Sequence, residues 1–470
     1  MEPSIVSLLP PLLAIGLAIW TRQVYLSLAA GVWLGWTVLA GWNPLRGIAD
    51  AIEGVVGVLG DAGNARVILF TLGIGALIAT LEAAGGVRGF VEWVEERRWV
   101  GTPRRARLLA WGLGVGIFIE SNITVLVAGA VSRPLFDRYR VSREKLAYLI
   151  DSTSAPICIL IPLNAWGAYI LGILATIGVE QPLTVFVASI AYNFYAIFAV
   201  ILAAIVAVWG VNWGGMRRAE ERVQGGELLR MGSVPAADAD VIAPEPLEGV
   251  RPAARNMILP ILVLIATMPI GLYVTGEGDI TAGSGSTSVL WAVLAAIASV
   301  WLLLLGGRAV GIGILTRVAI RGAGGLVGLA IILLLALALG NVTQELGTGT
   351  YVAGVIQGVF PPPVLLPLVF LTAAAIAFST GTSWGTFAIV LPIAVPAAGA
   401  LGLPLAPFLA AALSGGIFGD HASPISDTTI ISSLAAAVDH IDHVRTQLPY
   451  ALAAGGLAIV SFALTGFWIG

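Results

Sequence analysis

Runs of about 20 apolar residues recur along almost the whole chain, and each is long enough to cross the hydrocarbon core of a membrane as a helix. Three of them are residues 4–20, 24–41 and 67–84. Of the 470 residues, 58% are hydrophobic and only 11% are charged, whereas a soluble domain carries roughly a quarter charged residues. The sequence lacks the alternation of apolar and polar residues that is typical of strands in a transmembrane barrel. It therefore predicts an all-α polytopic membrane protein.

Arginine-rich segments divide the chain and set its expected orientation. Basic residues favour the cytoplasmic side of short loops, and three such segments are residues 88–107, 132–145 and 214–256. The first two flank one apolar segment, residues 108–131, so both can be cytoplasmic only if that segment enters and leaves on one side. We expect a re-entrant hairpin that turns at residues 120–124. The alternative is an ordinary helix with one basic loop outside.

A long segment that is interrupted near its middle follows this hairpin. Residues 146–179 exceed one straight crossing and contain DSTSAP, which predicts a helix broken in mid-membrane. A return crossing at residues 183–209 leads to residues 210–255, a segment rich in charge, proline and glycine that we interpret as a cytoplasmic linker. The first half of the chain is thus predicted to occupy residues 1–209.

The second half, residues 256–470, is predicted to repeat this plan in the opposite orientation. Its expected elements are helices at 257–274 and 289–305, an amphipathic piece at 306–322, a helix at 323–340, a hairpin at 361–399, a broken helix at 405–438, a charged loop at 439–447 and a final helix at 448–469. Inverted repeats of this kind are typical of secondary transporters. In total we expect about 10 transmembrane helices, two re-entrant hairpins and two broken helices.

Four polar breaks are expected at membrane depth, one in each hairpin and one in each broken helix. Carboxylate, hydroxyl and carbonyl oxygens are the ligands that replace the hydration shell of a small hard cation. The alternative is that the hydroxyls only cap the helix ends at the breaks. The candidates for binding an ion or substrate are Glu120, Ser121, Asn122, Thr124, Asp151, Ser152, Thr153, Ser379, Thr380, Thr382, Ser383, Asp420, Ser423, Asp427 and Thr428.

The carboxylates of these breaks have no lysine or arginine beside them in the four polar sequences. A carboxylate inside a membrane without a basic partner must be neutralised by a proton or by a cation, and one that accepts both can exchange them. We therefore predict proton coupling at Asp151, Asp420 and Asp427, with Na⁺ bound at Asp151 and Asp427.

The three histidines and the absence of several motifs further limit the chemistry that this chain can perform. His421, beside Asp420, is either a proton relay or ligand or a partner in a structural hydrogen bond. His440 and His443 have a spacing that could suit a metal, but with Arg445 following we interpret them as a structural or gating network. No P-loop, HExxH or GxSxG motif is present, so neither direct ATP drive nor enzyme chemistry has positive support. We expect no cofactor, with Na⁺ and H⁺ as the transported ions.

Two segments resemble the NhaC family of sodium/proton antiporters. They are residues 418–452, which begin FGDHASPISDTTI, and residues 138–169, which contain DSTSAPI. The resemblance implies a place in the wider ion-transporter superfamily, with a dimerising scaffold domain, a mobile transport domain and an elevator mechanism. It also implies that Asp151, Asp420 and Asp427 form or support the ion site. The first hairpin tip, ESNIT, departs from the family because it holds a single acid, and its Ser-Asn pair is similar to the tips of dicarboxylate carriers.

The sequence therefore predicts a Na⁺/H⁺ antiporter with an elevator mechanism, integral to the cytoplasmic membrane of a prokaryote. We expect a homodimer in the lipid bilayer, with neither nucleic acid nor nucleotide as a partner. One alternative is a Na⁺- or H⁺-coupled carrier or exchanger of a small organic acid or amino acid. Another is a channel lined by the broken helices, in which ion flux would need no proton counter-flow.

Overall fold

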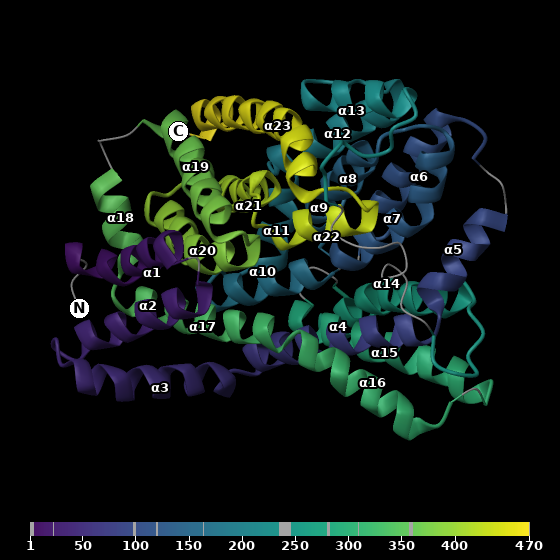
Figure 1. Ribbon diagram of the computed structural model, residues 1–470. Coiled ribbons are helices and arrows are strands. Elements are labelled where there is room, and N and C mark those ends of the chain that lie inside the picture. Colours follow the sequence, from purple (N-terminus) through teal and green to yellow (C-terminus); the bar gives the residue numbers. More distant parts are fainter. Residues whose placement is uncertain are drawn as a thin grey trace.

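The computed structural model describes the chain except for residues 1–3, 22, 97–99, 119–120, 163, 235–245, 280–282, 309, 357–360 and 470. The regular elements of this described part are helices (Figure 1). Before residue 210 they are η1 (Ile5–Leu8), α1 (Leu9–Thr21), α2 (Val24–Leu39), α3 (Pro44–Gly60), α4 (Ala62–Ala83), α5 (Gly86–Glu96), α6 (Pro103–Gly116), α7 (Ser121–Arg138), α8 (Arg143–Ser152), α9 (Ala155–Leu160), α10 (Ala165–Thr176), α11 (Pro182–Ile190) and α12 (Phe194–Trp209). After it come α13 (Gly215–Gln224), α14 (Arg255–Thr275), α15 (Gly285–Gly306), α16 (Ile312–Gly325), α17 (Val327–Glu345), α18 (Thr348–Ile356), α19 (Pro362–Thr380), α20 (Ser383–Ala400), α21 (Leu405–Ala422), α22 (Asp427–Ala436) and α23 (His440–Ile469).

Many of these helices have the length and apolar composition of membrane spans. Within the described residues, seven helices qualify, or up to nine if each of two bent pairs counts as one span. The bent pairs are α2 with α3, which turn by 117°, and α11 with α12, which turn by 42°. Large apolar side chains such as Trp20, Leu302 and Trp468 are more than two-thirds exposed on the outer faces, as expected where lipid replaces water. The prediction of a helical membrane protein is confirmed.

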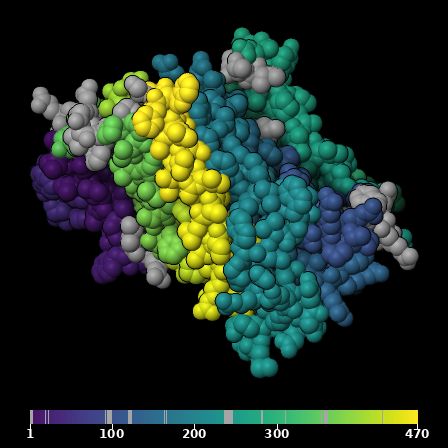
Figure 2. All heavy atoms as spheres, turned by 90° about the horizontal axis from the view of Figure 1, so that it is seen from above, coloured from purple at the N-terminus to yellow at the C-terminus, as the bar shows by residue number. Residues whose placement is uncertain are grey.

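The helices form two groups that lie side by side in Figure 1. In one, which we call the α4 group, α4 packs against α15 and α16, and α17 packs against α2 and α3. In the other, which we call the α21 group, α21 packs against α19, α20 and α23, while α22 packs against α7 and α8. Figure 2 shows α23, in yellow, running between the green and teal helices, and it contacts both α19 and α12. Helices from both halves of the chain therefore build the α21 group.

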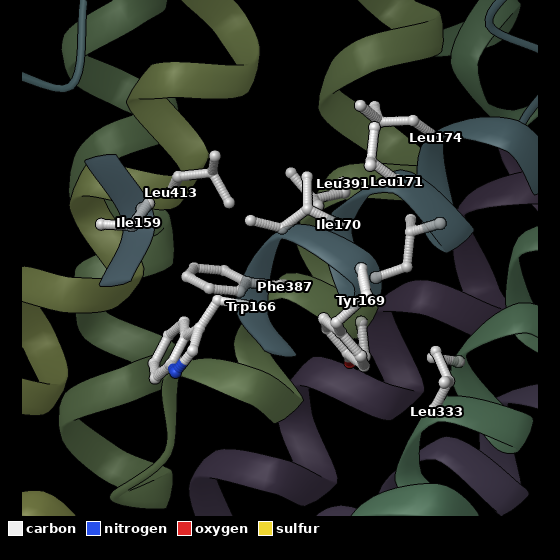
Figure 3. Close-up of a cluster of buried hydrophobic side chains, with 14 of the residues drawn as sticks. Ile159, Trp166, Tyr169, Ile170, Leu171, Leu174, Leu333, Phe387, Leu391 and Leu413 are labelled. Carbon is white, nitrogen blue, oxygen red and sulfur yellow. The ribbon is translucent and has the colours of Figure 1, made fainter. Parts of the chain in front are cut away.

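Helix α10 connects the two groups through a buried apolar cluster. Figure 3 shows Trp166, Tyr169 and Ile170 of α10 facing Phe387 and Leu391 of α20. The Tyr169 hydroxyl donates to the backbone oxygen of Trp384 at 2.8 Å, and the rings of Trp166 and Trp384 lie 4.5 Å apart between centroids. Since α10 also packs against α4, α15 and α17, it contacts both groups of helices.

The helices are interrupted at all four predicted polar sequences. Helix α6 ends at Gly116 and α7 begins at Ser121, and α19 and α20 are separated only by Gly381 and Thr382. Likewise α8 and α9 are separated by Thr153 and Ser154, and the four residues 423–426 separate the end of α21 from the start of α22. The orientation of the hairpins and the inverted relation of the two halves remain predictions.

The prediction that residues 439–447 form a charged loop is wrong, because α23 begins at His440. Asp439 Oδ1 accepts hydrogen bonds from the backbone N–H groups of Ile441 at 3.0 Å and Asp442 at 3.1 Å, as a capping side chain does at a helix start. One of the charges in this segment is paired, because Arg230 of the linker binds Asp442 at 3.0 Å. The sequence also predicts no helix where α3, α5, α13 and α18 lie; α5 occupies part of the arginine-rich segment 88–107, which the sequence predicts to be a loop.

Candidate functional site

A buried carboxylate, Asp151, lies in the last turn of α8 and is 1% exposed. Its Oδ2 accepts a hydrogen bond from Gln447 Nε2 at 2.8 Å and lies 3.3 Å from His443 Nε2. His421 Nε2 lies 3.8 Å from the same oxygen. Gln447 and His443 belong to α23, and His421 belongs to the last turn of α21. One amide and two imidazoles from the second half of the chain therefore surround a carboxylate from the first half.

Residues directly after Asp151 cause α8 to end at Ser152. Thr153 Oγ1 donates to the Leu149 carbonyl at 2.7 Å, and Ser154 Oγ donates to the Asp151 carbonyl at 2.8 Å. Pro156 stands in the first turn of α9, where its missing N–H is not needed. The hydroxyls of this break thus satisfy helix ends, and they leave the Asp151 carboxylate to contacts from other helices.

Gln447 ties Asp151 to the end of α21. Its Nε2 donates to the His421 carbonyl at 2.7 Å as well as to Asp151 Oδ2. Both partners can only accept hydrogen bonds when the carboxylate is ionised, so the amide nitrogen, not the amide oxygen, must face them. Gln447 Oε1 and His443 Nδ1 are buried and have no hydrogen-bond partner in the described part of the chain. Buried polar atoms of this kind call for a further partner.

His421 continues the polar cluster away from Asp151. Its Nδ1 lies 2.5 Å from the hydroxyl of Tyr195 on α12, and its Nε2 lies 3.3 Å from Ser152 Oγ. All three side chains are at least 96% buried. A continuous series of polar atoms therefore runs from Tyr195 through His421 to Ser152 and Asp151, which is the type of arrangement along which protons move.

A second carboxylate, Asp420, stands one residue before His421 and is 2% exposed. Ser383 Oγ donates to its Oδ2 at 2.8 Å, which joins α20 to α21. His421, the next residue, has its Nε2 3.8 Å from Asp151 Oδ2. The two predicted carboxylates thus belong to one polar region.

Each hairpin tip is tied to the broken helix of its own half. Asn164, the N-cap of α10, donates from Nδ2 to the carbonyls of Phe118 at 3.0 Å and Cys158 at 2.7 Å. In the second half, Ser423 Oγ donates to the Phe378 carbonyl at 2.8 Å. The tips therefore lie against the breaks, and side-chain to carbonyl bonds hold them there.

The predicted site residues divide into four sets. Asp151 and Ser152 meet at His421, and Asp420 meets Ser383. Four other hydroxyls bind backbone carbonyls within their own helix or hairpin: Thr124 to Ile117, Thr153 to Leu149, Ser379 to Ala375, and Thr380 to Ile376. Ser423 instead binds the Phe378 carbonyl across to α19. Ser121 is buried at the start of α7, Thr382 is the N-cap residue of α20, and Thr428 contacts Ser426 at 3.0 Å. Glu120 and the side chains of Asn122 and Asp427 lie outside the described part of the structure.

The premise that these carboxylates lack basic partners needs correction at Asp151. Two imidazoles lie within 4 Å of its Oδ2, although they are distant in sequence. The described residues contain no group of three or more His, Cys, Asp or Glu side chains arranged to hold a metal ion. Around Asp151 the described residues provide one carboxylate with amide, hydroxyl and imidazole neighbours.

Sequence analysis missed Gln447, Tyr195 and Asn164. A signal existed for Gln447, because it follows His443 by four residues and therefore shares its helix face. That signal was hidden by the interpretation of residues 439–447 as a loop. Tyr195 lies among the apolar residues of α12 and gave no signal at all.

Known proteins resemble this chain over different lengths. Residues 166–467 match the Na⁺/H⁺ antiporter family. An uncharacterized protein of Haemophilus influenzae is 38% identical over 489 aligned residues, which cover 99% of this chain and 91% of that protein. The malate-2H⁺/Na⁺-lactate antiporter of Bacillus subtilis is 39% identical over 134 residues, 26% of this chain and 28% of its own length. The arginine/ornithine antiporter of Halobacterium salinarum is 39% identical over 107 residues, 22% of each.

Two solved transporter structures share the fold. The YdaH transporter of Alcanivorax borkumensis superposes with a TM-score of 0.61 at 16% identity, covering 90% of this chain and 88% of its own. MtrF of Neisseria gonorrhoeae, described as one of a class of antimetabolite efflux pumps, gives a TM-score of 0.57 at 15% identity, covering 90% and 85%. At these identities the likeness concerns the fold alone, and it is the fold of a membrane transporter.

Proposed function

Because the chain belongs to the Na⁺/H⁺ antiporter family and is thus an integral membrane transporter, we propose that it exchanges Na⁺ for H⁺ at Asp151. The observation that carries this proposal is the burial of that carboxylate among Gln447, His443 and His421. A carboxylate removed from water is stable only when a proton, a cation or hydrogen-bond donors compensate its charge. Na⁺ and H⁺ then compete for one group.

The side chains around Asp151 have distinct parts in this exchange. Donation from Gln447 stabilises the ionised carboxylate that binds Na⁺, and Ser152 Oγ and Gln447 Oε1 supply further oxygens nearby. A proton that arrives through His443 or His421 neutralises the carboxylate and releases Na⁺. Exchange becomes obligatory if the site faces only one side of the membrane at a time.

Alternating access by an elevator motion is part of the proposal. The α21 group, together with α6 and α9 that pack on it, contains both hairpins, both breaks and Asp151, and we propose that it moves as a unit against the α4 group. Support comes from the parallel construction of the two halves, in which Asn164 and Ser423 tie each hairpin tip to its own break. We also propose that the halves are inverted repeats and that two copies of the chain associate in the membrane.

Purified protein in liposomes with an internal pH dye tests this function. A Na⁺ pulse should change the internal pH, and Asp151→Asn should reduce the change to the level of protein-free liposomes. Asp50→Asn is the matched control, because Asp50 lies on α3 in an exposed ion pair with Arg46. Undiminished exchange by correctly folded Asp151→Asn would refute the proposed site.

A second candidate function is the exchange of an organic acid or amino acid. Support comes from the partial matches to antiporters of malate and lactate and of arginine and ornithine. Protonated His421 or His443 could also face a substrate carboxylate beside the hydroxyls of Ser152 and Ser383. The same liposomes, loaded with labelled malate, lactate or arginine, distinguish the two functions. Na⁺-dependent solute movement without a Na⁺-driven pH change would favour this candidate.

A further inference from the structure

His440, the first residue of α23, joins the loop between α21 and α22 to α22 itself. Its Nε2 lies 2.6 Å from the Pro424 carbonyl oxygen, in the loop, and its Nδ1 lies 3.0 Å from Ser433 Oγ on α22. Ser433 Oγ also donates to the Thr429 carbonyl at 2.8 Å. His440 is half-buried, whereas Ser433 is fully buried. The imidazole therefore reaches solvent and an internal hydrogen bond at once.

The protons at these three contacts can be counted. The carbonyl oxygens of Pro424 and Thr429 only accept hydrogen bonds, and the Ser433 hydroxyl has one proton to donate. If that proton goes to Thr429, Ser433 Oγ can only accept from His440 Nδ1. Because Pro424 requires a proton on Nε2, all three hydrogen bonds form together only when both ring nitrogens carry protons.

The neutral ring must give up one of these bonds. With its proton on Nε2, it keeps Pro424, but Ser433 must turn its proton away from Thr429 to reach Nδ1. When the proton is on Nδ1 instead, Nε2 carries a lone pair that faces the Pro424 carbonyl oxygen, and the two electron-rich atoms repel each other. Binding of a proton therefore favours the arrangement that holds Pro424.

Two carboxylates and one arginine lie near His440. Asp439 and Asp442 lie on its own segment, and Arg230 from the linker is paired with Asp442. Burial alone would raise the pKa of the Asp439 carboxyl, but hydrogen bonds from the N–H groups of Val234, Asp442 and Ile441 outweigh it and hold that pKa below its usual range. Asp439 thus stays anionic at neutral pH.

Arg143, which binds the carbonyl of Ala437 just after α22, is already paired. Arg143 of α8 donates to the Ala437 carbonyl and forms two hydrogen bonds with Asp137 of α7, at 2.8 and 2.9 Å. Its charge is therefore compensated locally by Asp137.

We propose that His440 is a second proton-binding site, separate from Asp151, whose protonation anchors the loop of residues 423–426. That loop follows Asp420 and precedes Asp427, so the anchor controls the mobility of the break in the second half of the chain. Histidine changes its charge between about pH 5 and 8, so the loop is held most tightly at acidic pH, where both ring nitrogens carry protons, and more weakly at alkaline pH, where one hydrogen bond is lost. This inference does not depend on which ion or solute is transported.

The chain offers a direct test because Cys158 is its single cysteine and is buried. In a Cys158→Ser background, Ile425→Cys places a thiol on the loop at a position that is 37% exposed. The rate of maleimide labelling is measured from pH 5.5 to 8.5 with His440 present and with His440→Ala. The ratio of the two rates at each pH cancels the pH dependence of thiol reactivity. We expect His440→Ala to label about five-fold faster at pH 5.5 and by a clearly smaller factor at pH 8.5.

Two neighbouring serines provide a matched pair that does not require His440→Ala to fold. Ser433→Ala removes the acceptor of the Nδ1 proton, so it should flatten the pH dependence of loop labelling. Ser432→Ala, at a buried position without a hydrogen bond to His440, should leave it unchanged. The proposal is overturned if Ser433→Ala and Ser432→Ala give the same pH profile, or if the His440→Ala ratio does not change with pH.

Discussion

The side-chain amide of Gln447 donates to Asp151 Oδ2 at 2.8 Å, although 296 positions separate the two residues in the chain. The same nitrogen holds the last turn of α21 through the His421 carbonyl. One amide therefore joins the break of the first half, the break of the second half and the final helix. Because a donor stabilises the charged form of a carboxylate, this contact couples the protonation of Asp151 to the packing of three helices.

Replacing Gln447 by leucine should move the pH dependence of exchange upward. The substitution removes a donor to the ionised carboxylate, so Asp151 keeps its proton to a higher pH. A hydrogen bond to a charged group contributes about 1.5–3 kcal/mol, which corresponds to about one to two pH units. The pH of half-maximal Na⁺-driven exchange, measured in liposomes, should rise by about one unit or more.

Thr446→Val is the control for this prediction. Thr446 is buried beside Gln447, but its hydroxyl binds only the carbonyls of Asp442 and His443 in its own helix. Its replacement should leave the pH midpoint in place. Equal midpoints for Gln447→Leu and the unmodified protein would contradict a role of the amide in setting the charge of Asp151.

Removing the Tyr195 hydroxyl should destabilise the protein without disturbing its apolar packing. Tyr195→Phe keeps the ring against Phe418, at 5.0 Å between centroids, and loses the 2.5 Å contact with His421 Nδ1. A buried polar atom left without its partner costs about 1–3 kcal/mol. Denaturant unfolding in mixed micelles should show this loss. Tyr192→Phe, at a half-buried position three residues earlier in the turn between α11 and α12, should change stability by less than about 0.5 kcal/mol. Similar losses for both variants would show that the His421 contact is not specific.

The break at Asp151 could be predicted from sequence because helix ends depend on nearby residues. DSTSAP holds the hydroxyls that bond α8 carbonyls and the proline that begins α9, and all of these contacts span four residues or fewer. The same local logic located the breaks at residues 379–383 and 420–429. Apolar length and polar interruption are properties of short segments, so one sequence contains them in full.

The partners of Asp151 could not be predicted in this way. His421, His443 and Gln447 lie about 270 to 296 residues further along the chain, and they meet Asp151 only through the packing of α8 against α23 and of α21 against α23. No local pattern encodes such packing. The same reason explains why Thr153 and Ser379 were counted as ligand candidates: a hydroxyl that caps a helix and one that faces a site look alike in sequence.

The buried ion pair of Lys145 with Glu220 should contribute to stability far more than the exposed pair on the same linker helix. Lys145 Nζ lies 3.1 Å from Glu220 Oε2, and both side chains are less than 10% exposed. Lys145→Met leaves a buried, uncompensated carboxylate, which costs about 3–5 kcal/mol. Arg217→Ala breaks a pair with Glu221 that is more than 60% exposed on both sides and should cost less than about 1 kcal/mol.

A double variant separates the cost of an orphaned charge from the value of the pair. Lys145→Met combined with Glu220→Leu removes both charges, so it should destabilise the protein less than the sum of the two single changes. Unfolding midpoints of the four proteins give the coupling energy directly. Additive effects would mean that the two side chains do not stabilise each other and that α13 is held to α8 by other contacts.

Close packing of α21 against α19 should make Gly419 the least replaceable glycine near the site. A Cβ atom added there would lie well inside contact distance of the Ala374 carbonyl, which is backbone and cannot rotate away. Gly419→Ala should therefore force the two helices apart and cost at least about 2 kcal/mol. Since Asp420 follows directly, the 2.8 Å bond from Ser383 should be strained and exchange should fall as well. Gly456→Ala on α23 is the control, because its added Cβ atom meets no atom within 4 Å. This variant should be as stable as the unmodified protein or more stable by up to about 1 kcal/mol. Thermal unfolding of both variants tests the prediction, and equal losses of stability would show that contact with α19 is not the cause.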